Sequence, residues 1–215
     1  MIGATGVFRR VFVPAMLCIS GLLMVAAVQA QSEPAAHQHP HQHDHSAVMG
    51  AAIKRSEVVY QIPALALVRQ DGKKAIFPAE LDDGRPVMLQ FIYTSCTTIC
   101  PVTTRNFARV QEALGKESSQ VHMVSISIDP EYDTAPRLEA YAKKYAASAQ
   151  WQFYTGTLQD SVSLQKAFDA YRGDKMNHTP VTYLRLAPGK PWVRLDGLAS
   201  ADETLKQYRS LLAAR

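Results

Sequence analysis

Cysteine and surplus charge are both scarce in this chain of 215 residues. Its 3 cysteines are too few for a scaffold held together by disulfide bonds. Lys and Arg number 23 and Asp and Glu number 19, so the net charge is only +4, and no segment is densely basic. This charge pattern excludes a basic surface for binding nucleic acid. With 47% hydrophobic and 20% charged residues, the chain is not wholly disordered, and its length fits one domain or at most two.

The N-terminus has the layout of an export signal. A pair of arginines precedes an almost wholly apolar run over residues 11–28, and the sequence that follows suits cleavage after Ala30. We therefore predict a signal peptide over residues 1–30 and a periplasmic mature protein. The apolar run is long for a signal, so an uncleaved inner-membrane anchor facing the periplasm is the alternative.

Export would leave one cysteine pair. Cys18 falls inside the predicted signal, so the mature chain keeps Cys96 and Cys100 and no spare thiol. Without the two signal arginines the charge excess falls to 21 − 19 = +2. The periplasm is oxidising, so a thiol reductant must keep the pair reduced if it works as a dithiol.

A histidine-rich stretch follows the signal. Residues 31–57 are polar with little periodicity, which predicts a disordered linker. Within it, every second residue of one short tract is a histidine: His37, His39, His41, His43 and His45. Imidazole binds Zn, Cu and Ni, so we interpret the tract as a secondary metal site. The alternative is a solvated linker whose histidines have no ligand.

The remaining residues, 58–215, read as one α/β domain. Near-continuous apolar runs such as 86–93 and 121–128 are typical of strands covered on both faces. Strands are predicted over 65–70, 74–77, 86–93, 121–128, 151–155, 181–186 and 192–195, and helices over 101–115, 135–146, 157–171 and 200–213. This order predicts a central, mostly parallel sheet with helices on both faces, preceded by an N-terminal hairpin and closed by a second hairpin and a helix.

The chemistry concentrates on the Cys-x3-Cys segment that joins the strand 86–93 to a helix. Cys96 is expected in the connecting loop and Cys100 near the helix start, where the helix dipole and free N–H groups stabilise a thiolate. The spacing permits a disulfide and equally a two-thiolate metal site. A purely structural disulfide is the weaker interpretation, because so short a loop gains little stability from one.

This segment, the sequence SISIDPEYDT at 125–134 and the later His178 resemble the Sco/SenC family over roughly residues 58–213. Members have a thioredoxin-like fold and insert copper into the CuA centre of cytochrome oxidase. The resemblance implies that Cys96, Cys100 and His178 bind copper, and it matches Asp129 to an acidic position near the site. Thr97, Thr98 and Ile99 depart from members that carry Pro and an acidic residue between the cysteines, so thiol pKa and potential are expected to differ.

The resemblance implies a copper metallochaperone that holds one Cu(I) or Cu(II) ion at two sulfurs and one imidazole, a donor set suited to copper. Its implied partners are a membrane-bound copper oxidase or reductase subunit, a thiol reductant and another copper chaperone. The alternative is a thiol-disulfide oxidoreductase in which Cys96 attacks and Cys100 completes the redox pair. A peroxiredoxin-like peroxidase is disfavoured by the residues around Cys96. We expect His122 to be structural and Met176 to be a solvated loop residue.

Overall fold

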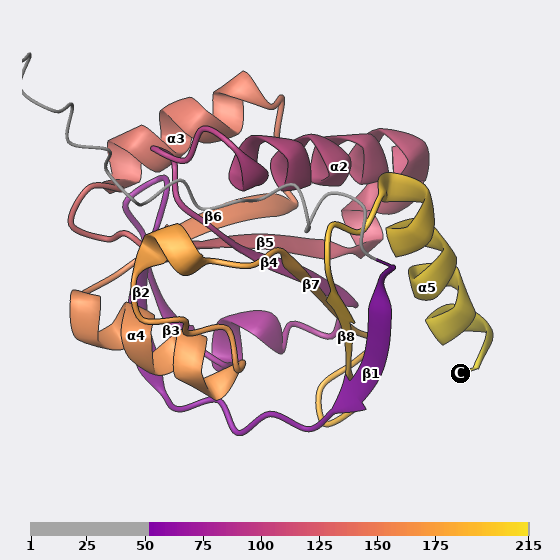
Figure 1. Cartoon of the computed structure of the whole chain (residues 1–215). Helices are drawn as coiled ribbons and strands as arrows, with labels where there is room; N and C mark the ends of the chain where they lie inside the picture. The colour runs from indigo at the N-terminus through magenta and orange to yellow at the C-terminus, as the bar shows by residue number, and fades with distance from the viewer. Residues whose placement is uncertain (1–51, 215) are drawn as a thin grey trace, which may run out of the picture. The chain divides into compact units, whose positions relative to one another are not determined.

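The computed structural model describes residues 52–214, which form an eight-stranded sheet flanked by helices (Figure 1). The strands are β1 (Lys54–Val58), β2 (Leu65–Arg69), β3 (Lys74–Phe77), β4 (Val87–Ile92), β5 (His122–Ser127), β6 (Trp151–Thr155), β7 (Val181–Arg185) and β8 (Trp192–Asp196). The helices are α2 (Ile99–Leu114), α3 (Ala135–Lys144), α4 (Leu158–Ala167) and α5 (Ala201–Ala213), with short 3₁₀ segments η1 (Ala79–Leu81), η2 (Gly115–Gln120) and η3 (Lys175–Asn177).

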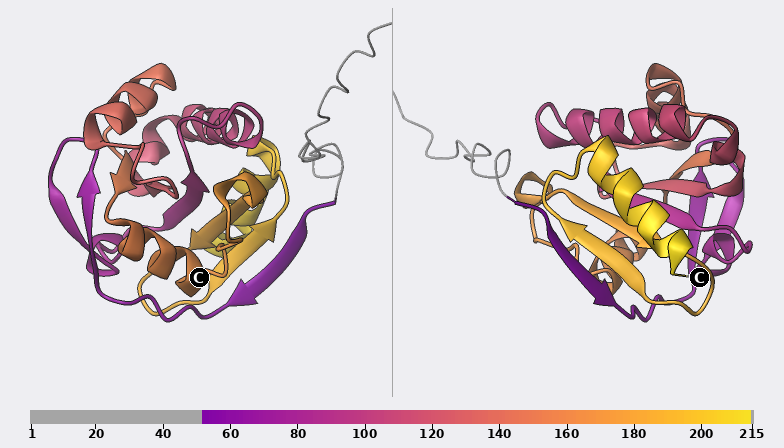
Figure 2. Two further views of the ribbon diagram at one scale, coloured as in Figure 1. Left: turned by 60° about the vertical axis from the view of Figure 1, so that its left-hand side comes forward. Right: turned by 90° about the vertical axis from the view of Figure 1, so that its right-hand side faces the viewer.

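The sheet runs in the order β1-β8-β7-β4-β5-β6-β2-β3. Helices α2 and α3 cover one face and α4 covers the other, while α5 packs beside α2 (Figures 1 and 2). Every residue of β4 and β5 is buried, as expected for strands covered on both sides. The predicted α/β layering is therefore confirmed.

The sheet is mixed, and the prediction that it is mostly parallel is wrong: within residues 52–214, five of its seven strand pairings are antiparallel, and parallel pairing is confined to the middle of the sheet. β4 pairs with β5 and β5 with β6 in parallel, because α2 and α3 serve as the crossover connections. β7 returns antiparallel to β4, and the outer strands on both sides are also antiparallel. The predicted hairpins account for β2–β3 and β7–β8.

Strand β1 corrects the predicted boundary of the disordered linker. Residues 31–57 were all expected to be linker, but β1 begins at Lys54 and pairs antiparallel with β8. Its sequence, KRSEV, gives no apolar alternation because β1 is an edge strand with much of its surface exposed. The ladder to β8, over a hundred residues away, is what orders it. The predicted signal segment 1–30 and the tract from His37 to His45 lie outside the described residues.

Two other boundaries differ from the prediction. Helix α2 begins at Ile99 rather than Pro101, which places Cys100 inside its first turn. Helix α4 ends at Ala167, short of residue 171, and Asp169 then takes a positive φ of 50° that a continuing helix does not allow. None of the helices within residues 52–214 is long and apolar enough to span a bilayer.

An aromatic cluster fixes the end of β4 that leads into the cysteine loop. The Phe91 ring lies 5.8 Å from that of Phe168 and 6.0 Å from that of Tyr183, both edge-on. Phe168 is fully buried and also meets Trp192 edge-on at 5.2 Å. Such contacts hold the Phe91 backbone in place, and its carbonyl proves to be part of the site.

Candidate metal centre

The two cysteines lie in contact at the junction of β4 and α2. Cys96 lies in the loop after β4 and is 8% exposed, whereas Cys100 in the first turn of α2 is completely buried. The Cys100 N–H donates to Cys96 Sγ at 3.4 Å, and both residues are free thiols. The structure therefore places both cysteines at a strand-to-helix junction, where the sequence predicted them.

The two sulfurs differ strongly in acidity. The pKa of Cys96 is lowered to about 4, chiefly by the hydrogen bond from the Cys100 thiol. Backbone N–H groups of Cys100 and Thr98 and the Tyr93 hydroxyl assist, against the opposing effect of burial. The Cys96 thiolate and burial together raise the pKa of Cys100. At neutral pH the pair therefore consists of a thiolate at Cys96 and a protonated thiol at Cys100.

His178 lies at the end of the loop before β7 and is only 8% exposed. Its Nε2 is 3.1 Å from the Phe91 carbonyl oxygen. A carbonyl only accepts hydrogen bonds, so Nε2 carries the proton and Nδ1 keeps a free lone pair. Burial lowers the pKa of His178 to about 4, so the ring is neutral at pH 7, which is the form that binds metal ions.

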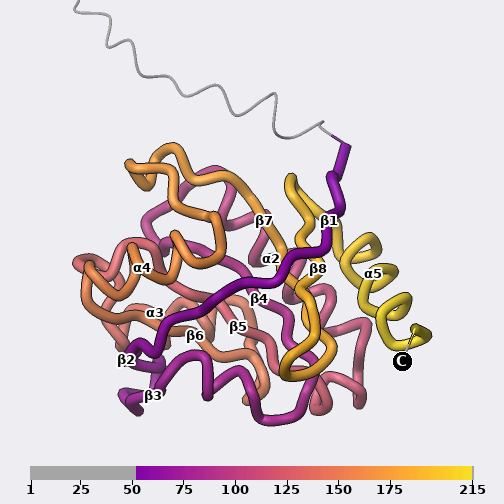
Figure 3. The backbone as a smooth tube through the Cα atoms, turned by 90° about the horizontal axis from the view of Figure 1, so that it is seen from below, coloured from indigo at the N-terminus to yellow at the C-terminus, as the bar shows by residue number. Residues whose placement is uncertain are grey.

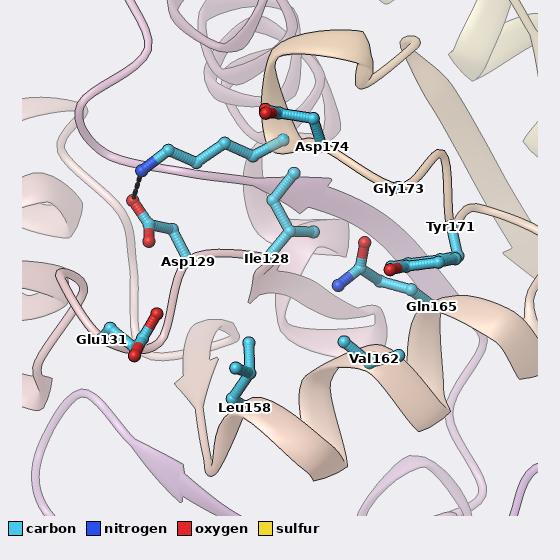
Figure 4. Close-up of a pocket in the computed structure, with 10 residues that line it drawn as sticks. Ile128, Asp129, Glu131, Leu158, Val162, Gln165, Tyr171, Gly173 and Asp174 are labelled. Carbon is cyan, nitrogen blue, oxygen red and sulfur yellow. Dashed lines mark hydrogen bonds and ion pairs between the residues drawn. The ribbon is translucent and has the colours of Figure 1, made fainter.

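The segment before His178 is tied to the cysteine side of the fold. Lys175 Nζ donates to Asp129 Oδ2 at 2.5 Å, and the Tyr93 hydroxyl donates to Met176 Sδ at 3.7 Å. Asp129, Asp174 and Lys175 line a hollow of about 360 Å³, and Figure 4 labels Asp129 and Asp174 in it. Asp129 therefore anchors the histidine segment through Lys175.

Asp133 is a supporting residue of the cysteine loop that the sequence analysis missed. It is fully buried, and its carboxylate accepts hydrogen bonds from the Thr94 backbone N–H at 3.1 Å, the Thr94 hydroxyl and the Ser127 hydroxyl at 2.6 Å. Thr94 lies in the cysteine loop, so Asp133 fixes the course of that loop. The only sequence signal was its position in the same motif that drew attention to Asp129.

The predicted site residues are brought together to different degrees. Cys96 and Cys100 touch, and the charge of Cys96 raises the pKa of His178, which shows that the ring lies within electrostatic range of the thiolate. Within residues 52–214, however, no three His, Cys, Asp or Glu side chains already surround one point as a metal cluster. The His178 ring is held by its hydrogen bond to the Phe91 carbonyl.

The other two candidates differ in how near they lie to this centre. His122 is at the start of β5, the opposite end of the sheet, where its Nε2 is 3.0 Å from Gln152 Oε1, consistent with the predicted structural role. Met176 is 44% exposed, as expected, although its sulfur accepts the Tyr93 hydroxyl.

The architecture defines a thioredoxin-like α/β protein whose loop after β4 brings two free cysteines into contact. A family model described as SCO1/SenC matches residues 61–213, and the chain belongs to that family. BsSco, solved as "a member of the Sco family of cytochrome c oxidase assembly proteins", is 29% identical, with a TM-score of 0.61 over 72% of this chain and 95% of that one. ScoI of Arabidopsis thaliana, solved with copper bound, shares the fold at 24% identity and a TM-score of 0.61, over 72% of this chain and 100% of that one.

Curated relatives match a shorter stretch. The SCO1 protein homolog of Bacillus subtilis (strain 168) is 34% identical over 104 residues, which are 48% of this chain and 53% of that protein. The SCO2-like protein RC0895 of Rickettsia conorii is 29% identical over 134 residues, which are 58% of this chain and 63% of that protein. The chain thus matches less than two thirds of the length of either relative.

Proposed function

We propose that this protein is an exported copper metallochaperone that holds one copper ion through Cys96, Cys100 and His178. The observation that carries the proposal is the state of His178. Its buried, neutral ring donates through Nε2 to the Phe91 carbonyl, which leaves Nδ1 unprotonated on a ring within electrostatic range of the Cys96 thiolate. Histidines that ligate metals characteristically donate their other N–H to a carbonyl or carboxylate in this way.

The donor set suits copper. Two cysteine sulfurs and one imidazole nitrogen match the preference of Cu(I) for soft ligands, and an added oxygen ligand would suit Cu(II). Cys96 is already deprotonated, so it can take up the ion first. Cys100 binds as a thiolate only after releasing its proton to solvent, so binding displaces one proton.

Family membership supports copper as the cargo and a respiratory enzyme as the recipient. ScoI of Arabidopsis thaliana was solved with copper bound, and BsSco belongs to a family of cytochrome c oxidase assembly proteins. We propose delivery by ligand exchange to a membrane-bound copper oxidase, most specifically its CuA site. The predicted signal over residues 1–30 supports action in the periplasm, with a thiol reductant keeping the cysteines reduced and another copper chaperone supplying the ion.

One observation favours a second function, thiol-disulfide oxidoreductase. The lowered pKa of Cys96 and the raised pKa of Cys100 give an attacking thiolate and a resolving thiol. Cys96 would attack a target disulfide and form a mixed disulfide, releasing one target thiolate. Deprotonated Cys100 would then attack Cys96, releasing the second target thiolate and leaving a Cys96–Cys100 disulfide. An external dithiol must supply two electrons to restart the cycle.

His178→Ala separates the two functions, because only the copper site needs the imidazole. We expect the variant to reduce disulfides at the wild-type rate but to bind copper more weakly, with Cu(II) affected more than Cu(I), since two sulfurs alone can satisfy Cu(I). Asn177→Ala is the matched control, because it changes an exposed residue of the same loop. Copper affinity is measured in both oxidation states on reduced protein. Unchanged affinity in both states, together with an altered thiol rate, would favour the oxidoreductase.

A further inference from the structure

The hollow of about 360 Å³ beside the proposed metal centre has features that the copper site does not use. It is lined by α4, by residues that follow β5 and by the segment between α4 and β7, whose course Figure 3 shows. Part of its lining is apolar or aromatic (Figure 4): Ile128, Leu158, Val162 and Tyr171. Residues 173–175 also line it and lead directly to His178. The hollow therefore shares a loop with the metal centre but contains none of its three proposed ligands.

Gln165 on α4 presents an unused hydrogen-bond acceptor to this hollow. The residue is only 6% exposed, and its Nε2 donates to Ser161 Oγ at 3.2 Å. The Ser161 hydroxyl already donates to the Ser127 carbonyl at 3.0 Å, so Ser161 Oγ can only accept, which fixes the orientation of the Gln165 amide. Gln165 Oε1 has no donor among the residues that the structure describes, and Figure 4 shows the amide in the hollow. A donor that enters the hollow would satisfy this oxygen.

The charges that line the hollow are mostly negative. Three carboxylates and one ammonium group line it, from Asp129, Glu131, Asp174 and Lys175, so the net charge is 1 − 3 = −2. Lys175 pairs with Asp129 at 2.5 Å, whereas neither Glu131 nor Asp174 has an ion-pair partner within residues 52–214. The groups left without partners in the hollow thus accept hydrogen bonds, and the charge favours a cation that donates them.

The exposed apolar side chains of the domain gather around the same hollow. Within residues 52–214, six large hydrophobic side chains are exposed, and four of them line the hollow or directly follow a residue that does: Tyr132, Leu158, Tyr171 and Met176. Leu158 is 50% exposed and Met176 is 44% exposed. Exposed apolar groups that cluster with a polar rim mark a surface for another protein. Since Met176 accepts the Tyr93 hydroxyl, this surface extends to the cysteine loop.

We propose that the hollow binds an arginine side chain of a partner protein and that the exposed apolar residues around it pack against the same partner. A guanidinium group is planar and has five N–H donors, so it can donate to Gln165 Oε1 and to a carboxylate at once. Its aliphatic stem can pack against Leu158 and Val162. Arginine is also enriched in protein interfaces, whereas lysine is depleted.

A cation already lies near one wall of the hollow. Lys166 Nζ lies 5.2 Å from the centroid of the Tyr171 ring, although Lys166 does not line the hollow. The ring thus tolerates positive charge beside it. That the bound partner exchanges copper or thiols with the neighbouring cysteines rests on the proposed function, but the binding of arginine needs no copper.

The test is a titration of the reduced, copper-free full chain, labelled with nitrogen-15, followed by nuclear magnetic resonance. The probes are acetyl-Gly-Arg-Gly-amide and the same peptide with citrulline, which has nearly the shape of arginine but no charge. We expect the arginine peptide to shift the signals of the Gln165 side-chain amide and the Gly173 backbone N–H. It should bind at least about tenfold more tightly than the citrulline peptide, and more weakly at about 0.5 M salt.

Two variants and a matched control locate the site. Gln165→Met removes the acceptor and keeps the length of the side chain, so we expect about tenfold weaker binding of the arginine peptide. Glu131→Gln removes one carboxylate and should weaken binding about threefold, which keeps the test valid if the buried Gln165 variant does not fold. Glu139→Gln is the control, because it neutralises an exposed glutamate of α3 outside the hollow, and binding should stay as in the wild type.

The outcomes separate this proposal from the copper site. Equal binding of the arginine and citrulline peptides, or signal shifts only at residues outside the hollow, would overturn the proposal. Tighter binding of agmatine than of the peptide would make the occupant a small guanidine and overturn the partner protein. Copper affinity is measured on the same variants, and we expect it to be unchanged. A wild type that binds the arginine peptide but no copper would instead overturn the proposed function.

Discussion

Replacement of Cys100 by alanine should remove the largest cause of the unusual acidity of Cys96. In the reduced, metal-free wild type the pKa of Cys96 is about 4, against 9.0 for an ordinary thiol, and the largest cause is the hydrogen bond from the Cys100 thiol. At pH 6 an ordinary thiol is only about one part in a thousand thiolate, whereas Cys96 is almost entirely ionised. In Cys100→Ala the thiol donor is lost while burial still opposes the charge, so the pKa of Cys96 rises.

The effect of the lowered pKa is clearest in how steeply the reaction rate of Cys96 rises with pH. A thiolate with a pKa five units lower is intrinsically about 100- to 300-fold less nucleophilic, which cancels most of its advantage in ionised fraction. Absolute rates at pH 6 should therefore differ by only several-fold. The wild-type rate should stay flat from about pH 6 to 8, while an ordinary thiol gains about tenfold per pH unit over that range.

The assay is alkylation with iodoacetamide under anaerobic conditions, with the modified cysteine identified by mass spectrometry. We expect label on Cys96 alone in the wild type, because Cys100 is protonated and fully buried. Cys100→Ala should restore the steep pH dependence at Cys96, and Cys100→Ser, which keeps a hydroxyl donor, should fall between the two. A wild-type rate that climbs tenfold per pH unit, or an alanine variant as flat as the wild type, would refute the reasoning.

Two further predictions concern stability. Asp133→Ala leaves the N–H and hydroxyl of Thr94 and the hydroxyl of Ser127 without their acceptor. We therefore expect the free energy of unfolding to fall by about 2–3 kcal/mol and the melting temperature in calorimetry to fall by about 5–12 °C. A change under about 2 °C would show that water replaces the carboxylate. The lowered pKa of Cys96 contributes stability that is complete above its unfolded pKa of about 9 and is lost as the pH falls toward about 4. The denaturation free energy of reduced wild type minus that of Cys96→Ser should therefore increase from pH 5 to pH 8, and a difference that is constant or decreases contradicts the assignment.

The parts of the fold set by local pattern were predictable from sequence. The apolar runs at β4 and β5 identify buried strands whatever surrounds them, and the C-x3-C spacing at the junction of a strand and a helix identifies the dithiol. β1 was missed because an edge strand needs few apolar residues, and its pairing with β8 depends on chain segments far apart in sequence.

The supporting contacts of the site were harder to predict. His178 could be proposed from the family resemblance, but its hydrogen bond to Phe91 involves a backbone carbonyl, which every residue has, so no side-chain pattern marks it. Asp133 lies four residues after Asp129 in one short motif, and only the folded turn decides which carboxylate faces the cysteine loop. Sequence analysis therefore identified the reactive atoms better than the residues that position them.

The contact between Cys96 and the Cys100 N–H has a consequence for helix α2. Thr98, at the N-cap position, makes no side-chain capping bond, and the first turn holds no acidic residue. The Cys96 sulfur anion thus acts as the helix cap, a role usually filled by Asp, Ser or Thr and worth about 1 kcal/mol. Forming a disulfide removes the negative charge and so weakens the cap. The start of α2 is therefore expected to lose part of its stabilisation when the pair is oxidised.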